Sequence, residues 1–193
     1  MGNLGSIVNM FRRIGHPAQV TNDLETILNA QKILLPGVGA FDAAMERING
    51  SELRQVLDKK AKIDRIPILG ICLGMQLLTN QSDEGKLPGL GWIQASTKRF
   101  PSLPGLKIPH MGWNLVSQSN PSELTINLPE DARFYFVHSY YVQVVNPEHS
   151  ILRSSYGTTF DSAIRCGNIY GAQFHPEKSH KFGMQLLSNF AKL

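Results

Sequence analysis

One cysteine stands in a pattern that suits a nucleophile. Cys72 has a glycine two positions before it and another two positions after it, Gly70 and Gly74. The turn lies between an apolar run, residues 66–71, and an amphipathic run, residues 73–78, which predicts a strand, a sharp turn and a helix. This is the nucleophile-elbow pattern G-x-S-x-G with cysteine in place of serine, and it places the thiol at a helix N-terminus, where the helix dipole favours a thiolate. A lone cysteine is more often a buried structural residue, and the two glycines at this junction favour the nucleophile instead.

The candidate base and its orienting group come late in the chain. A cysteine nucleophile needs a base, and the base needs a group that holds it in place. His175 follows a run that predicts a strand, residues 169–174, so it lies at a strand end. Pro176 favours an extended conformation at His175, and residues two apart in an extended segment project to the same side. Glu177 is therefore predicted to hold one imidazole nitrogen while the other faces the thiol.

Two stretches could supply N–H donors to a negatively charged acyl-transfer intermediate, which such chemistry requires. The amide of Leu73, directly after the nucleophile, is the first candidate. The second is the flexible turn Gly37-Val38-Gly39, which follows another predicted strand. From the residues alone, this turn is equally well interpreted as a plain connection between a strand and a helix.

The elements that must position these residues alternate in the first half of the chain. Helices are predicted at residues 4–14, 22–28, 40–57 and 73–78, and strands at residues 18–21, 32–35 and 66–71. Apolar residues at helical spacing identify the first helix, and Asn22 and Asp23 are good helix caps. Strands that alternate with helices argue for a parallel sheet.

The second half of the chain is richer in short β runs. Strands are predicted at residues 133–137, 141–145 and 151–154, with a hairpin of residues 163–165 and 169–174 and a closing helix at residues 181–193. Turn residues separate these runs, as in antiparallel sheets. We see no linker long enough to divide the chain, and we predict a single domain over residues 1–193.

The composition is that of an ordinary globular protein. Of the 193 residues, 42% are hydrophobic and 18% are charged, and the net charge of +4 is spread along the chain, which argues against nucleic acid as a partner. Cys72 and Cys166 do not make a disulfide framework, which favours a reducing cytoplasm. No run is long and apolar enough to cross a bilayer. The histidines, of which His110 and His138 are weaker catalytic candidates, lack metal-ligand spacing, so we expect no metal.

Three stretches together resemble the class I (triad) glutamine amidotransferases. They are residues 36–39, 70–76 and 175–177. Within that family the chain is most similar to the glutaminase subunits of imidazole glycerol phosphate synthases. The stretches that carry this closer similarity are residues 35–41, 109–114 (PHMGWN), 134–140 (FYFVHSY) and 173–179 (QFHPEKS). The resemblance runs in order along nearly the whole chain and implies an α/β fold of the flavodoxin-like type, with helices on a mostly parallel central sheet and a β-rich second half.

The resemblance also implies roles for individual residues. Cys72 would attack the carboxamide carbon of glutamine, His175 would move the proton, and Glu177 would orient His175. The expected oxyanion segment comprises Val38, Gly39 and Leu73. The residues expected to hold the glutamine substrate are Gln76, Glu84, His138, Ser139 and Tyr140, the last three through backbone groups. No cofactor is expected.

The same resemblance implies a partner. Family members deliver ammonia through a shielded path to a (β/α)8-barrel synthase subunit, where ammonia and a phosphorylated ribulosyl precursor give imidazole glycerol phosphate in histidine biosynthesis. Asn3, Met111, Trp113 and Lys178 are expected to face that partner in a heterodimer. Trp113 is equally well interpreted as a core residue under a loop.

Other functions are open. The stretch of residues 175–183 resembles paralogues that supply ammonia to an amino-sugar amidotransferase in surface-polysaccharide biosynthesis. A cysteine hydrolase or peptidase on the same architecture would act on other substrates without a partner; Gln76, Glu84 and the PHMGWN stretch argue against it. A truncated, inactive module that only supports a synthase is a third interpretation.

The resemblance has one departure, at the start of the chain. The family begins with a strand of the Ile-Asp-Tyr type followed by Gly-Met-Gly-Asn, and this sequence starts at Met1-Gly2-Asn3, inside that motif. The first strand is therefore expected to be missing, which would expose a neighbouring backbone edge. Our hypothesis is a misassigned start codon or a truncated chain.

Overall fold

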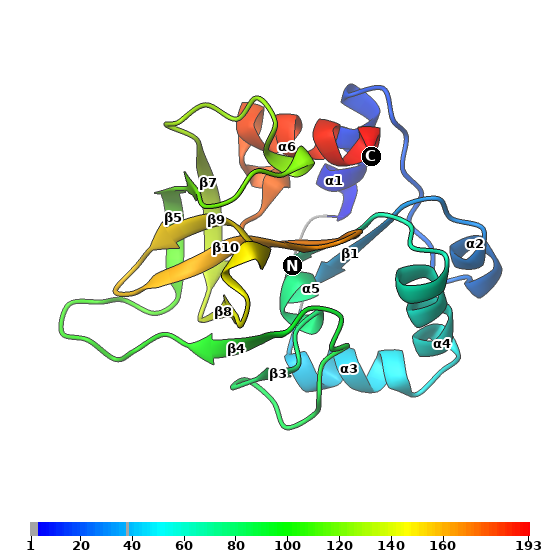
Figure 1. Cartoon of the computed structure of the whole chain (residues 1–193), viewed down its shortest axis with the longest axis horizontal. Helices are drawn as coiled ribbons and strands as arrows, with labels where there is room; N and C mark the ends of the chain where they lie inside the picture. The colour runs from blue at the N-terminus through cyan, green and yellow to red at the C-terminus, as the bar shows by residue number, and fades with distance from the viewer. Residues whose placement is uncertain (1–3, 38) are drawn as a thin grey trace.

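The computed structural model describes residues 4–37 and 39–193, which form one large sheet, one small sheet and the helices around them (Figure 1). The large sheet contains β1 (Ile33–Gly37), β2 (Ile68–Cys72), β3 (Gln81–Ser82), β4 (Ala95–Arg99), β6 (Ser117–Gln118), β8 (Tyr140–Val144), β9 (Ser150–Ser155), β10 (Thr159–Cys166) and β11 (Ile169–Ala172). The small sheet pairs β5 (His110–Leu115) with β7 (Arg133–His138).

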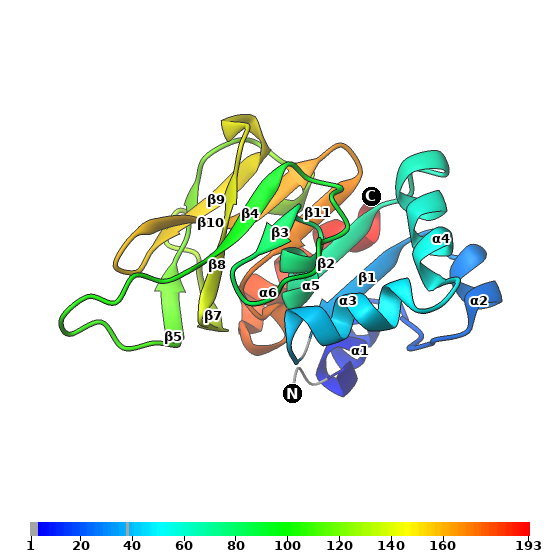
Figure 2. The same cartoon turned by 90° about the horizontal axis from the view of Figure 1, so that it is seen from below.

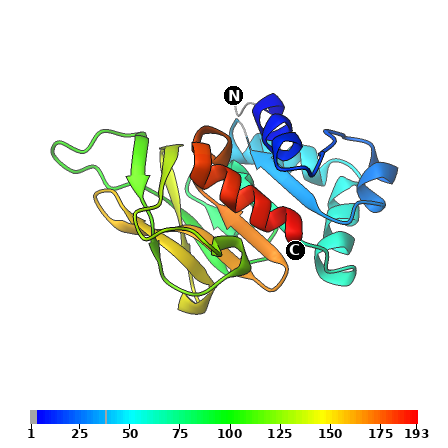
Figure 3. The same cartoon turned by 90° about the horizontal axis from the view of Figure 1, so that it is seen from above.

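The α-helices are α1 (Leu4–Arg13), α2 (Leu24–Leu28), α3 (Phe41–Asn49), α4 (Leu53–Asp58), α5 (Leu73–Leu77) and α6 (His180–Lys192). A π-helical segment, η1 (Lys59–Ile63), continues α4, and the 3-10 segments are η2 (Glu123–Thr125), η3 (Pro147–His149) and η4 (Pro176–Lys178). α1 and α6 lie side by side on one face of the large sheet (Figure 3). Figure 2 shows the small sheet at the end of the molecule opposite α2 and α4.

Alternating residues of β2 pack into two separate hydrophobic cores, one on each face of the sheet, as expected for a strand covered on both faces. Leu69 and Ile71 pack into the core that contains the apolar residues of α1 and α6. Ile68 packs into the second core, with Met45 of α3 and Met75 of α5. Apolar contact on both faces therefore fixes β2, the strand that ends at Cys72.

The large sheet is mixed rather than mostly parallel. Its order is β1-β2-β11-β10-β8-β4-β3, with β9 on β10 and β6 on β9. β1, β2 and β11 run parallel, as do β3 and β4, whereas the pairings of β10, β8 and β9 are antiparallel. The parallel expectation holds for the strands around Cys72. In the second half, where turn-separated strands and a hairpin were expected, the pairings are antiparallel because hairpins connect strands there without a crossover helix.

Most of the elements predicted from the sequence are present, and two predictions need correction. Residues 18–21 were expected to form a strand, but they form no strand and are largely exposed, because no described strand lies beside them to complete a ladder. The strand expected at residues 32–35 is β1, which extends two residues further, to Gly37, and it is half-buried because it is an edge strand of the sheet. Within the described residues no strand precedes α1.

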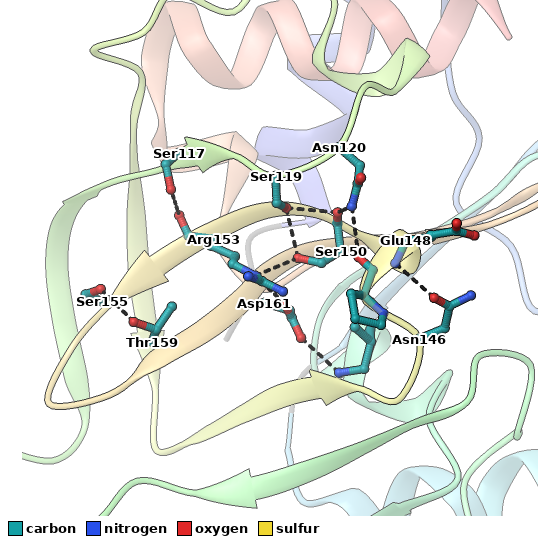
Figure 4. Close-up of polar contacts among 12 residues, drawn as sticks. Ser117, Ser119, Asn120, Asn146, Glu148, Ser150, Arg153, Ser155, Thr159 and Asp161 are labelled. Atoms are coloured by element: carbon teal, nitrogen blue, oxygen red, sulfur yellow. Dashed lines mark hydrogen bonds and ion pairs between the residues drawn. The ribbon is translucent and has the colours of Figure 1, made fainter.

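A buried carboxylate ties β8, β9 and β10 together (Figure 4). Oδ1 of Asp161 accepts a hydrogen bond from Arg153 Nε at 3.2 Å, and Oδ2 accepts one from the backbone N–H of Val144 at 2.8 Å. Arg153 Nε also lies 3.3 Å from Ser150 Oγ. These bonds complete the ladder near the β10 bulge and hold β8, whose first residue is Tyr140.

The length and polarity of the helices decide whether one of them could cross a membrane. Among the residues that the structure describes, each helix is too short or too polar to traverse a lipid bilayer.

Candidate active site

Cys72 lies where a strand meets a helix. It is the last residue of β2, and α5 begins at Leu73. Its backbone has a positive φ, with φ 55° and ψ −112°, which is uncommon for a residue with a side chain. Strain of this kind is typical of a nucleophile elbow, where a sharp turn exposes the nucleophile above the sheet. The predicted strand, turn and helix around the thiol are confirmed.

Three glycines let β1, β2 and α5 approach closely at this turn. A Cβ atom on Gly74 would overlap the carbonyl oxygen of Leu35, and one on Gly37 would overlap the backbone nitrogen of Gly74. A Cβ on Gly70 would lie 2.5 Å from the carbonyl oxygen of Gly74. These contacts explain why both glycines of the elbow pattern are needed, and they bring the end of β1 against the start of α5.

The parallel register then brings together residues from three distant parts of the chain. Gly37 of β1 is the register partner of Cys72, and Ala172 of β11 is the partner of Ile71. Because the carboxyl ends of parallel strands meet at one edge, the turn after β1 and the segment after β11 both reach the thiol. His175 follows β11 by three residues, which places it next to Cys72.

The backbone of His175 is fixed from both sides. Its N–H donates to the carbonyl of Tyr135 in β7 at 2.9 Å, and its carbonyl accepts from Ser179 Oγ at 2.6 Å. Ser179 Oγ also accepts from the backbone N–H of Tyr135 at 3.0 Å. The histidine is thus held in the small sheet rather than on a free loop.

His175 and Glu177 form a buried pair. Nδ1 of His175 lies 2.8 Å from Oε1 of Glu177, the pairing that was predicted. The backbone is extended only at His175, and the 3-10 segment η4, rather than an extended segment, brings Glu177 to the imidazole. Burial lowers the pKa of His175, but the interactions with Cys72 and Glu177 outweigh burial and raise this pKa to about 9. Within the described residues Nε2 has no hydrogen bond to another nitrogen or oxygen. Since Glu177 occupies Nδ1, Nε2 is the nitrogen that can exchange a proton with the thiol.

Two further groups contact the sulfur atom. The amide Nε2 of Gln173 lies 3.7 Å from Cys72 Sγ, and the carbonyl of Val137 in β7 lies 3.9 Å from it. Gln173 belongs to one of the stretches that carry the family resemblance, but its own role was missed. Its position directly after β11, opposite Cys72 in the parallel register, was the signal that could have found it.

Part of the expected oxyanion segment can be located. Leu73 is the first residue of α5, so its N–H is at the helix N-terminus beside the nucleophile. Gly39 has a φ of 97°, a conformation that favours glycine, in the turn between β1 and α3. Val38 lies outside the described residues, and so does Asn3.

Among the residues expected to bind the substrate, Gln76 is connected to the nucleophile through one intermediate residue, Gln173. Its amide nitrogen donates to Gln173 Oε1 at 3.2 Å and to the carbonyl of Tyr140 at 3.3 Å. His138 is buried, and both of its ring nitrogens are hydrogen-bonded to other protein groups. The side chain of His138 is therefore engaged within the protein, while Ser139 and Tyr140 are half-buried beside it.

Glu84 lies near the start of α3. Burial raises the pKa of Glu84, the N–H of Phe41 opposes this rise, and the charge of Asp42 adds to it. Asp42 in turn accepts hydrogen bonds from the backbone N–H groups of Lys86 and Leu87, at 2.9 to 3.0 Å. Asp42 was not predicted from the sequence, and it holds the loop that carries Glu84 against α3.

Of the residues expected to face a partner, Met111 and Trp113 lie on the small sheet and Lys178 lies beside it. Met111, Trp113 and Leu115 alternate along β5 and are 62%, 45% and 57% exposed. Trp113 therefore is not a core residue. Lys178 is exposed, and its Nζ lies 5.4 Å from the centre of the Tyr135 ring. Across the described part of the chain, no cluster of histidine, cysteine, aspartate or glutamate could hold a metal ion.

The fold and this cluster define an α/β protein with a cysteine elbow and a His–Glu pair at the carboxyl edge of parallel strands. The family model for "Glutamine amidotransferase class-I" matches residues 2–193, and the chain belongs to this family. The expected flavodoxin-like α/β fold is therefore confirmed, with the mixed sheet described above.

Close relatives extend over the full chain. The chain is 53% identical over 192 residues to "Imidazole glycerol phosphate synthase subunit HisH 2" of Methanococcus maripaludis, with 100% of this chain and 95% of the relative covered. It is 47% identical to the HisH subunit of Bdellovibrio bacteriovorus, with 100% of this chain and 96% of the relative covered.

Solved structures agree on the fold. A crystal structure of a glutamine amidotransferase has a TM-score of 0.75 at 14% sequence identity and covers 100% of this chain and 95% of its own. A second one, of a glutamine amidotransferase from Thermotoga maritima, has a TM-score of 0.60 at 20% identity, with 91% of this chain and 71% of its own covered. At these identities the likeness concerns the fold alone.

Proposed function

We propose that the chain is the glutaminase subunit of an imidazole glycerol phosphate synthase in histidine biosynthesis. The observation that carries the proposal is the cluster of Cys72, His175 and Glu177 at the edge of the parallel strands. The full-length similarity to HisH subunits supports the choice of pathway. The chain would act as a single domain over residues 1–193, in the cytoplasm and without a cofactor.

The geometry suits hydrolysis of glutamine through a thioester. Cys72 gives its thiol proton to His175 Nε2, and the sulfur attacks the side-chain carboxamide carbon. The carbonyl oxygen becomes an oxyanion that the N–H of Leu73 would stabilise together with the turn at Val38 and Gly39. His175 Nε2 gives a proton to the leaving nitrogen as the C–N bond breaks, and ammonia departs. Water then attacks the thioester, loses a proton to His175, and releases glutamate and the thiol. Glu177 keeps Nδ1 occupied, so that Nε2 carries every proton.

The glutamine substrate would lie between α5, the Glu84 loop and the start of β8. Gln76 can hydrogen-bond the substrate through its amide, and the carboxylate of Glu84 suits the α-ammonium group. Backbone groups of His138, Ser139 and Tyr140 would complete the site. Asp42 supports this arrangement by fixing the Glu84 loop.

Ammonia would pass to a (β/α)8-barrel synthase subunit that docks on the small sheet. The exposed side chains of Met111, Trp113 and Leu115 support this surface, because they alternate along β5 and so share one face, and a contiguous exposed apolar patch marks an interaction site. Lys178 lies beside them, next to Tyr135, and Asn3 completes the expected contact set. Trp113, Arg133, His180, Lys181 and Phe182 line a hollow of about 570 Å³ on the same face.

Glutamate release and synthase turnover test the proposal together. We expect the wild-type chain with the synthase subunit and its ribulosyl ligand to release glutamate from glutamine. Cys72→Ala should reduce this rate by about 10⁴-fold or more, and should leave turnover with ammonium chloride unchanged. Cys166→Ala is the matched control and should keep both activities.

Two outcomes would overturn the proposal. A wild-type complex that releases no glutamate is not a glutaminase of this pathway. A Cys72→Ala complex that also loses ammonia-dependent turnover would show that the residue is structural.

A further inference from the structure

A buried chain of hydrogen bonds links the small sheet to the nucleophile. It begins at Asn114 of β5, whose amide nitrogen lies 3.3 Å from Nε2 of His110. Nδ1 of His110 lies 2.9 Å from Nε2 of His138, and Nδ1 of His138 lies 2.7 Å from the carbonyl oxygen of Tyr140. Four groups from β5, β7 and β8 are thus joined in series.

The direction of each bond in this chain is determined by its last member. The Tyr140 carbonyl can only accept, so Nδ1 of His138 carries the hydrogen and Nε2 of a neutral His138 accepts. His110 then donates from Nδ1 and accepts at Nε2, where the Asn114 amide donates. Burial lowers the pKa of His110 to about 4 and that of His138 to about 3, which agrees with neutral rings. Each ring therefore has one tautomer, which the network assigns.

The Tyr140 carbonyl is the junction with the catalytic groups. It also accepts from Gln76 Nε2 at 3.3 Å, and that nitrogen donates to Gln173 Oε1 at 3.2 Å. Gln173 in turn donates from Nε2 to Cys72 Sγ at 3.7 Å. A change in the orientation of the Tyr140 carbonyl would therefore move two amides, one of which contacts the sulfur.

Packing alone does not account for the two histidines. The His110 ring is stacked between Phe136 at 4.8 Å and Tyr156 at 4.1 Å, and the His138 ring lies 5.1 Å from Phe100. An aromatic cluster of this kind would pack equally well with hydrocarbon rings. Two buried polar rings carry a desolvation cost that only satisfied hydrogen bonds offset, and such networks specify position.

We infer that His110 and His138 are positioning residues for the glutaminase reaction, acting through the Tyr140 carbonyl on Gln76, Gln173 and Cys72. This inference rests on the proposed function, because it concerns the same reaction. Neither histidine side chain needs to touch the substrate. Their function is to hold the carbonyl, and with it the amide that lies against the sulfur.

Three substitutions of His138 separate positioning from packing. His138→Phe keeps the aromatic cluster and removes both hydrogen bonds. His138→Asn places an amide nitrogen near the position of Nδ1, so it keeps the bond to Tyr140 and leaves a cavity. His138→Gln reaches the position of Nε2 and keeps only the bond to His110. His149→Asn, at a histidine in η3, is the control.

The measurement is glutamine-dependent and ammonia-dependent turnover of the complex with the synthase subunit. We expect His138→Phe and His138→Gln to lose glutamine-dependent turnover by about 10- to 100-fold, the loss that a small misplacement of reacting groups produces. His138→Asn should retain most of that turnover, and ammonia-dependent turnover should stay unchanged in all variants. His149→Asn should behave as wild type.

The rank order of the glutamine-dependent turnover of the three His138 variants tests the inference. If packing is the role, His138→Phe is the most active variant and His138→Asn the least, and the inference is wrong. If His138→Phe does not fold, the comparison of Asn with Gln decides, since equal or higher activity of the Gln variant overturns the inference. A wild-type complex without glutaminase activity would instead refute the proposed function.

Discussion

His175 and the pair of His110 and His138 are all buried, but their surroundings shift their pKa values in opposite directions. His175 faces the carboxylate of Glu177 and the thiol of Cys72, and its pKa rises to about 9. The four ring nitrogens of the other two histidines face an imidazole, an amide and a carbonyl. Burial then dominates, and the pKa values fall to about 4 and about 3.

This difference separates two uses of the same side chain. An imidazole beside an acid can take a proton and give it back near neutral pH, which is what acid–base catalysis requires. An imidazole among neutral partners keeps one tautomer over that range and acts as a fixed link with a donor at one end and an acceptor at the other. The positive charge of His175 reinforces the division, since it disfavours a second charge on His138.

Removing the catalytic imidazole is expected to have the largest effect. In His175→Asn no group remains to protonate the leaving ammonia, so glutamine-dependent turnover of the complex should fall by about 10⁴-fold or more. Ammonia-dependent turnover of the same complex is the control and should not change. A loss of less than about tenfold would mean that another group moves the proton, and the contrast between the two histidine sites would fail.

Replacing the carboxylate of Glu177 by an amide tests the cause of the raised pKa of His175. In Glu177→Gln the amide oxygen can still accept from Nδ1, so we expect a loss of glutamine-dependent turnover of up to about 10⁴-fold, smaller than for His175→Asn. The pKa of His175 should fall, because burial is then opposed by the thiol alone. NMR titration of the His175 imidazole in wild type and in the variant measures this shift. An unchanged pKa would show that Glu177 does not set the charge of His175.

The catalytic residues could be predicted because their signals are local. The glycines around Cys72 and the His-Pro-Glu spacing describe conformations within a few residues, and the parallel alternation of strands and helices brings those segments to one edge. The closeness of His110 and His138, which are 28 positions apart, depends on the antiparallel register of β5 and β7. Nothing in either segment alone encodes that register.

The features that the sequence analysis predicted wrongly or missed also depend on contacts between distant segments. Residues 18–21 have the composition of a strand, but a strand exists only where a neighbour completes its hydrogen bonds. Gln173 and Asp42 were missed because their importance lies in what they contact, Cys72 Sγ in one case and the Glu84 loop in the other. The residue types gave no signal for either contact.

The two histidine sites should respond to pH in opposite directions. The folded-state pKa values of His110 and His138 lie below the ordinary value of 6.5, so the unfolded chain binds more protons below that pH. Their contribution to stability is full above pH 6.5 and is lost as pH falls through about 4 and about 3. At pH 5 the loss is about 2 kcal/mol for each histidine. His175 contributes below pH 6.5, and that contribution is lost as pH rises through about 9.

Urea unfolding at several pH values separates these contributions. Between pH 6.5 and 5 the free energy of unfolding should fall for wild type and fall about half as steeply for His138→Phe, because one of the two neutral histidines is gone. Between pH 6.5 and 9 the two proteins should lose stability in parallel, since both keep His175. Equal slopes in the acid range would show that His138 is not buried as a neutral group.

The smallest effect is expected at the far end of the hydrogen-bond chain. Asn114→Ala removes the donor to His110 Nε2, which is the longest bond between Asn114 and Tyr140 at 3.3 Å. His110 and His138 remain joined to the Tyr140 carbonyl, so glutamine-dependent turnover should fall by about threefold or less. The measurement is the turnover of the complex beside His138→Phe. A loss as large as for His138→Phe would mean that the chain acts by placing β5 as a whole, because Asn114 also anchors β5 to the carbonyl of Ser155. A small loss would instead localise the effect at Tyr140, where the neutral histidines meet the amides that reach the nucleophile.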